Sequence, residues 1–167
     1  MPCTYGIIFL AYYHVPVDPQ HVKYLCFTWK GRLYQFKVLC FGVRNAPYIF
    51  DRLGKSVRFF LNLLGVRIVI YIDDLLVLAS SFEQCIRDAQ LVVDTLVKLG
   101  FHIKVKKCVF TPSQDVFFLG YLWSTRAMSV SLPEEKLTNI KDLCSRVWET
   151  SRVSVKLLQR LFGVILA

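Results

Sequence analysis

The sequence lacks the groupings of cysteine and histidine that hold metal ions or form disulfide frameworks. Its six cysteines stand far apart, none belongs to a Cys-x-x-Cys pair, and its three histidines are scattered. This spacing excludes a zinc-binding module and a small disulfide-stabilised secreted domain. We therefore predict reduced thiols and an intracellular protein, located in the cytoplasm or the nucleus.

The sequence also lacks a hydrophobic run long enough to cross a membrane. Its longest nearly apolar stretch covers residues 59–72, and Asn62 and Arg67 interrupt it. A bilayer-spanning helix needs about 20 consecutive apolar residues. The apolar residues 6–13 follow no basic residue and precede no small-residue cleavage site, which excludes a typical secretory signal. We expect no membrane partner.

Acidic residues are scarce in this chain of 167 residues. Lysine and arginine number 21 against 12 aspartates and glutamates, which gives a net charge of +9. A hydrophobic content of 54% provides for a folded core, so disorder is not expected. A basic, aromatic-rich chain favours a polyanionic partner, most simply nucleic acid. The alternative is an ordinary solvated basic surface.

Two of the few acidic residues, Asp73 and Asp74, are adjacent and lie between two apolar runs. Residues 66–70 and 75–79 predict two strands that this pair joins as a tight turn. An ordinary acidic turn is the alternative, because aspartate is common in turns. The purely apolar flanks, and a turn without glycine or asparagine, favour a functional pair.

The two adjacent carboxylates repel each other, so a cation or a set of hydrogen-bond donors must keep both ionised. Mg²⁺ prefers carboxylate oxygens together with substrate phosphates. The pair beside a basic surface therefore indicates Mg²⁺-assisted phosphoryl or nucleotidyl transfer. Neighbouring strand residues point to opposite faces, so we expect Asp73 to be the main metal ligand and Asp74 to have a secondary part.

The order of the predicted elements indicates an α+β fold. Helices are expected over 46–64 and 82–98, capped by Asn45 and Ser81. With the strands around them they give a split β-α-β-β-α-β arrangement, with a hairpin inserted after the first strand. After Pro133 two further helices predict a small helical lobe. The expected strands cover residues 5–13, 22–29, 33–39, 66–70, 75–79, 101–110 and 115–123, with a turn at 111–113.

Several segments, in the right order, resemble motifs of reverse transcriptases. Residues 71–74 (YIDD) resemble the signature turn, and residues 39–50 (LCFGVRNAPYIF) resemble a Leu-Pro-Phe-Gly-x-x-x-Ala-Pro-x-x-Phe motif. A single such motif is weak, but the ordered series is a strong signal. The pattern is most similar to eukaryotic retrotransposons, with the DIRS type as one candidate. The other matching segments are residues 11–17, 99–108, 118–121, 132–137 and 157–163.

The resemblance implies a palm over residues 1–131 and a partial helical thumb over residues 132–167. It implies that the protein binds an RNA or DNA template-primer and a deoxynucleoside triphosphate (dNTP), and that Asp73 and Asp74 bind catalytic Mg²⁺. It also implies that Lys107 donates a proton to the leaving pyrophosphate. A solvated lysine is the alternative for Lys107.

The resemblance further implies residues for the nucleotide and for the primer. Tyr12 would lie under the sugar of the incoming nucleotide, although a core tyrosine is the alternative, and Phe41 and Gly42 would complete the pocket. The primer end would be held by Phe118, Leu119 and Gly120.

One position departs from the family where catalysis is concerned. The family has an aspartate five residues before the tyrosine of its Ala-Tyr pair, and here that position is Ile7. The nearest downstream acid, Asp18, lies 11 residues further on, roughly 36 Å along an extended strand at about 3.3 Å per residue. Residues 1–10 do not resemble the family, and its fingers lobe would precede residue 1. We therefore expect a truncated copy that is inactive alone.

Two other interpretations stay open. A non-catalytic nucleic-acid-binding remnant would bind duplexes in a salt-dependent way that ignores the substitution Asp73→Asn. A protein-interaction or unstable fragment would expose apolar surface near residues 5–13 and 27–29. An RNA-recognition module fits less well, because it would carry exposed aromatic residues on its central strands instead of an acidic hairpin.

Overall fold

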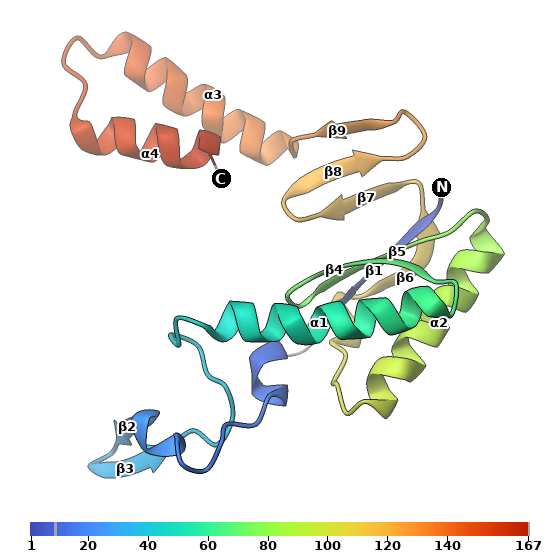
Figure 1. The fold of residues 1–167 in the computed structure, drawn as a ribbon. Helices are drawn as coiled ribbons and strands as arrows, with labels where there is room; N and C mark the ends of the chain where they lie inside the picture. The colour runs from blue at the N-terminus through green and yellow to red at the C-terminus, as the bar shows by residue number, and fades with distance from the viewer. Residues whose placement is uncertain (9, 167) are drawn as a thin grey trace.

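The computed structural model describes residues 1–8 and 10–166 (Figure 1). Its central sheet has four antiparallel strands in the order β4-β5-β1-β6. Together with two helices these strands form the split β-α-β-β-α-β arrangement, which confirms the predicted fold class. The elements in chain order are β1 (Cys3–Ile7), α1 (Ala46–Leu63), β4 (Arg67–Tyr71), β5 (Asp74–Leu78), α2 (Phe82–Lys98) and β6 (Val109–Ser113).

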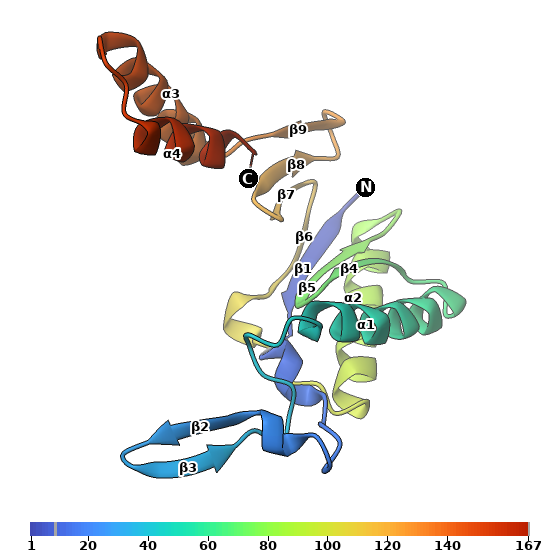
Figure 2. The same ribbon diagram turned by 60° about the vertical axis from the view of Figure 1, so that its left-hand side comes forward.

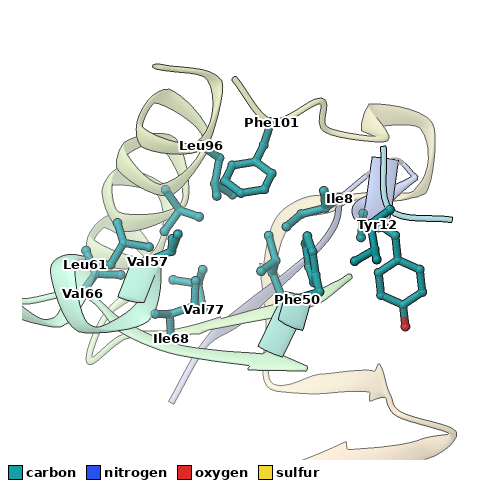
Figure 3. Close-up of a cluster of buried hydrophobic side chains, with 14 of the residues drawn as sticks. Ile8, Tyr12, Phe50, Val57, Leu61, Val66, Ile68, Val77, Leu96 and Phe101 are labelled. Carbon is teal, nitrogen blue, oxygen red and sulfur yellow. The ribbon is translucent and has the colours of Figure 1, made fainter. Parts of the chain in front are cut away.

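The main core lies between one face of this sheet and helices α1 and α2. Strand alternation directs Ile68 and Val77 toward the helices, and Figure 3 shows them beneath Val57, Leu61 and the neighbouring side chains. The expected split arrangement thus buries one sheet face and leaves the other for a second contact. The buried residues of α1 are Ala46, Phe50, Gly54, Val57 and Leu61.

Apolar residues at three- and four-residue steps predict a buried stripe on α1 made of Phe50, Leu53, Val57, Phe60 and Leu64. This prediction is partly wrong. Phe50 and Val57 are buried as predicted, whereas Leu53, Phe60 and Leu64 are exposed. The contact line instead passes through Gly54, where an added Cβ would lie 3.3 Å from Ile70 Cγ2. A small residue at the closest approach does not register in a search for apolar periodicity, so the predicted stripe was displaced toward the edge of the helix.

A second sheet covers part of the opposite sheet face. Cys3 and Leu76 of the central sheet pack against Val116 and Phe118. The single strand expected at 115–123 is wrong, because the chain turns back after Phe118 and forms two strands. The turn expected at 111–113 is also wrong, because these residues belong to β6. β6 is an edge strand, and an edge strand tolerates Pro112. The strands are β7 (Asp115–Phe118), β8 (Tyr121–Ser124) and β9 (Ser129–Ser131).

The first strand is shorter than predicted. β1 ends at Ile7, and the short 3-10 helix η1 (Ala11–His14) follows Leu10, whose φ of 50° is left-handed. The backbone N–H of Ile8 donates to the carbonyl of Asp73 at 2.9 Å. This bond brings the end of β1 directly beside the acidic turn.

Two peripheral parts lie on either side of the central sheet (Figures 1 and 2). The inserted hairpin, β2 (Cys26–Trp29) and β3 (Arg32–Gln35), follows the 3-10 helix η2 (Val22–Tyr24) and has only exposed strand residues. Helices α3 (Glu134–Glu149) and α4 (Val155–Leu166) pack against each other and bury Leu143 and Leu161. Among the described residues, no helix combines the length and apolar character that crossing a bilayer requires.

The two predicted helix caps differ in outcome. Ser81 accepts a hydrogen bond from the backbone N–H of Gln84 at 3.2 Å, which confirms it as the N-cap of α2. Asn45 occupies the predicted N-cap position of α1, but its side chain makes no cap bond. Proline in the first turn of α1 removes a backbone donor that a cap would otherwise satisfy.

Candidate active site

The acidic hairpin is a two-residue turn under strain. Tyr71 pairs with Asp74 in the β4–β5 ladder, so Ile72 and Asp73 form the turn. The predicted turn of Asp73 and Asp74 is therefore wrong by one residue, because Asp74 already belongs to β5. Such turns need positive φ, and Ile72 supplies it at 52° although β-branched residues rarely adopt that region. Ile72 also packs against the main core, and the Ile8–Asp73 backbone bond holds the tip. These contacts offset the strain and fix the position of Asp73.

A pocket of about 230 Å³ lies beside this turn. Segments far apart in the sequence meet there: the end of β1, η1, the loop before α1, the acidic turn and the start of the 3-10 helix η3 (Val105–Lys107). Four predicted site residues line it: Asp73, Lys107, Tyr12 and Phe41. The remaining lining residues are Ile7, Ile8, Leu10, Ala11 and Lys104.

Tyr12 belongs to both the core and the pocket. Its ring lies 5.1 Å from that of Phe41 and 5.8 Å from that of Phe50, between centroids, and only 9% of the residue is exposed. Figure 3 shows its hydroxyl pointing away from the core cluster. Burial raises the pKa of the Tyr12 phenol, and the nearby Asp73 carboxylate raises it further. A rigid aromatic floor with a neutral hydroxyl results.

The basic side of the pocket comes from the η3 turn. The backbone N–H of Lys104 donates to the carbonyl of Ile7 at 2.9 Å, and that of Lys107 donates to the carbonyl of Lys104 at 2.8 Å. Residues three apart on a 3-10 turn lie on the same side, so both lysines reach the pocket. Sequence reasoning missed Lys104, and the i, i+3 spacing was the signal that could have found it.

Gly42 follows Phe41 but does not line the pocket. Its φ of 91° is left-handed, and an added Cβ would meet no atom within 4 Å. The glycine therefore serves the turn conformation that presents the exposed Phe41 ring.

Asp74 has different neighbours from Asp73. It does not line the pocket, and its Oδ1 accepts a hydrogen bond from the hydroxyl of Tyr5 at 2.5 Å. Burial raises the pKa of Tyr5, and the bond to Asp74 adds to this shift.

The predicted primer residues form the β7–β8 turn, away from the pocket. Phe118 pairs with Tyr121 in the β7–β8 ladder. Leu119 and Gly120, which connect these two residues, both have positive φ. Phe118 is buried against the Tyr5 ring at 6.1 Å between centroids. Tyr5 therefore connects this turn to Asp74 of the acidic hairpin.

The donor set for a metal ion is incomplete. Ile7 pairs directly with Asp74 and lines the pocket beside Asp73, so the position of the family's third carboxylate is apolar. Within residues 1–8 and 10–166, no three His, Cys, Asp or Glu side chains gather in a way that could hold a metal. The residues present fit one cation shared with substrate phosphates, and they do not fit a two-metal site.

The four-stranded antiparallel sheet of this order, with two helices on one face and an acidic hairpin beside a basic pocket, agrees with the polymerase class that the motifs predicted. The sequence comparison identifies the particular family. Residues 8–122 match the family described as "Reverse transcriptase (RNA-dependent DNA polymerase)". The chain belongs to this family and is a reverse transcriptase domain of a retroelement, as its motifs predicted.

Curated relatives agree with this assignment. The Retrovirus-related Pol polyprotein from transposon opus of Drosophila melanogaster is 26% identical over 154 residues, which are 92% of this chain and 14% of the relative. The corresponding polyprotein from transposon 297 is 25% identical over 67% of this chain and 10% of its own length. This chain therefore spans only a small part of the curated relatives it matches.

Solved structures share the fold. A foamy viral protease-reverse transcriptase in complex with RNA/DNA hybrid aligns with a TM-score of 0.81 at 21% identity, over 98% of this chain and 20% of that one. The same enzyme in complex with dsDNA aligns with a TM-score of 0.82 at 20% identity, over 98% of this chain and 32% of that one. The structural match thus includes β1, which precedes the sequence match.

Proposed function

We propose that this chain binds a template-primer and a dNTP as the palm and partial thumb of an RNA-directed DNA polymerase, inside the cell. The observation that carries the proposal is the convergence of Asp73, Tyr12, Phe41 and Lys107 on one pocket from four separate segments. The structural relatives in complex with RNA/DNA hybrid and dsDNA support a nucleic-acid partner.

Each lining residue has a part that suits a nucleoside triphosphate. Lys104 and Lys107 attract the phosphates, and their two charges exceed the single charge of Asp73. Tyr12 lies under the sugar, where its ring leaves no room for a 2′-hydroxyl. Asp73 would be the main protein ligand of a bound Mg²⁺, which would neutralise the phosphates. In a catalytically complete site, where the primer oxygen bonds to the α-phosphorus and pyrophosphate leaves, Lys107 would give the pyrophosphate a proton.

The same geometry argues against nucleotide addition by the chain as it stands. Ile7 places a butyl side chain where a third carboxylate would complete the metal site. The ion that activates the primer hydroxyl then lacks a protein ligand, so we propose that the chain binds its substrates without joining them. The chain nevertheless keeps the backbone that an aspartate at position 7 would need.

Primer extension on an RNA template, with Mg²⁺ or Mn²⁺, tests both parts of the proposal. We expect no extension by the unchanged chain, and template-directed extension by Ile7→Asp that is abolished by adding Asp73→Asn. Extension by the unchanged chain that Asp73→Asn abolishes would refute the inactivity. Salt-dependent duplex binding without any dNTP binding would favour the non-catalytic nucleic-acid-binding remnant instead.

A further inference from the structure

The hydrogen bond from Tyr5 to Asp74 is set by the central sheet. Tyr5 and Ile7 lie two residues apart on β1, and Ile7 pairs with Asp74 at the start of β5. Tyr5 and Asp74 are therefore diagonal neighbours on one sheet face, a separation that an aromatic side chain spans. The bond length of 2.5 Å between Tyr5 Oη and Asp74 Oδ1 is that of a hydroxyl donating to a carboxylate.

Both partners are held from more than one side. Asp74 has β1 and β4 as neighbours, through its pairs with Ile7 and Tyr71. The Tyr5 ring packs edge-on against Phe118 of the second sheet. Tyr5 has only two side-chain torsions, so little freedom is lost in keeping this geometry. The bond is thus a fixed feature of the face that carries the acidic hairpin.

We propose that Tyr5 is a positioning residue that holds Asp74 away from a divalent cation, so that a cation in the pocket has Asp73 as its only carboxylate ligand. The inference rests on the proposed function, because it concerns the metal site of that pocket. A cation that binds Oδ1 of Asp74 must displace the phenolic proton donor from that oxygen. The hydroxyl and the cation therefore compete for the same carboxylate.

The apolar residue at position 7 favours the Tyr5 hydroxyl over the cation in this competition. In a complete site, a second carboxylate facing Asp74 would add charge for the cation and help it displace the hydroxyl. Ile7 supplies no such charge, and it lies directly opposite Asp74. The Tyr5 hydroxyl thus stabilises the Asp74 carboxylate by a hydrogen bond, without any metal ion. The Tyr5 ring also connects the acidic hairpin to the β7–β8 turn through its contact with Phe118.

Titration of the purified chain with Mn²⁺, followed by the electron paramagnetic resonance signal of the free ion, tests the proposal without any enzymatic activity. We expect Tyr5→Phe to bind Mn²⁺ about fivefold more tightly than the unchanged chain. The gain is smaller than the strength of the lost charge-assisted hydrogen bond, because water donates to Asp74 in the variant in place of the hydroxyl. The gain must vanish in Tyr5→Phe/Asp74→Asn. Tyr34→Phe, on the exposed β3 strand, is the matched control and should leave the affinity unchanged.

The outcomes separate the two proposals. If Asp73→Asn weakens Mn²⁺ binding but Tyr5→Phe leaves it unchanged or weakens it, the role of Tyr5 is overturned and the metal role of Asp73 stands. If Asp73→Asn has no effect, or no variant binds Mn²⁺, the proposed metal site itself fails. Tyr5→Phe keeps the ring against Phe118, and circular dichroism confirms that each variant is folded before titration.

Discussion

At the scale of single residues, the pocket depends on which charges the backbone brings together. Asp73 is held by a strained turn and a backbone bond, while Lys104 and Lys107 come from one 3-10 turn that is bonded to the end of β1. The excess of positive charge suits a phosphate-bearing ligand better than a free cation. Lys106 belongs to the same turn but does not line the pocket, and it provides an internal comparison.

Removing either pocket lysine should weaken triphosphate binding. Each ammonium group facing phosphates contributes on the order of 1 kcal/mol in a partly exposed site, so Lys104→Ala and Lys107→Ala should each weaken dTTP binding about fivefold. Isothermal titration calorimetry at low salt measures the effect. Lys106→Ala should change the affinity less than either, and equal losses for all three variants would mean that the effect is long-range.

The raised pKa of Tyr5 predicts alkaline destabilisation. Its pKa in the folded chain lies above that in the unfolded chain, so the folded state keeps its proton at higher pH. The stabilisation is fully present below the unfolded pKa of about 10 and is lost as pH rises toward the folded pKa. Urea unfolding between pH 9 and 11 should show a steeper loss of stability for the unchanged chain than for Tyr5→Phe. Parallel curves for the two proteins would contradict the prediction.

At the scale of elements, helix α1 is placed by a glycine. Gly54 lies against β4, and a Cβ added there would be only 3.3 Å from Ile70 Cγ2. The helix carries Phe50 and the loop before it carries Phe41, so its distance from the sheet also sets the pocket floor. Helix propensity alone would disfavour glycine here, and tertiary packing overrides it.

Substituting the two helical glycines should have opposite effects on stability. Gly54→Val should destabilise the chain by about 1–3 kcal/mol, because the branched side chain pushes α1 off the sheet. Gly163 in α4 has open space around it, so Gly163→Ala should stabilise by about 0.5–1 kcal/mol through helix propensity. Urea denaturation followed by circular dichroism gives both values. A stabilising Gly54→Val would show that α1 has room to move.

At the scale of the whole molecule, the chain exposes apolar surface on its peripheral hairpin. Trp29 and Leu33 on β2 and β3 are exposed, and the Phe27 and Tyr34 rings stack on each other without cover. Exposed apolar surface of this kind promotes association. The hairpin lies away from the central sheet in both views (Figures 1 and 2). Trp29 and Leu33 are not among the residues of the main core.

Charged substitutions on this hairpin should reduce association and leave the core intact. Trp29→Lys/Leu33→Lys should lower the apparent mass at high concentration in light scattering, with the unfolding midpoint of the core unchanged. The expectation follows because neither residue packs against the main core. Two lysines introduced on a buried surface would lower the unfolding midpoint. A lower midpoint for Trp29→Lys/Leu33→Lys would therefore show that the hairpin is part of the core.

Local pattern in the chain sufficed for the element order, the acidic hairpin, the Ser81 cap and the family, because apolar periodicity and short motifs are written in neighbouring residues. Tertiary contacts alone decided that Lys104 shares a pocket with Asp73 and that Tyr5 donates a hydrogen bond to Asp74. The hydrogen bond between Tyr5 and Asp74 joins residues 69 positions apart in the sequence and depends on the register of β1 against β5. No local sequence pattern encodes this register. Tertiary contacts also decided that Gly54 lies at the helix–sheet contact, because close approach selects for the absence of a side chain.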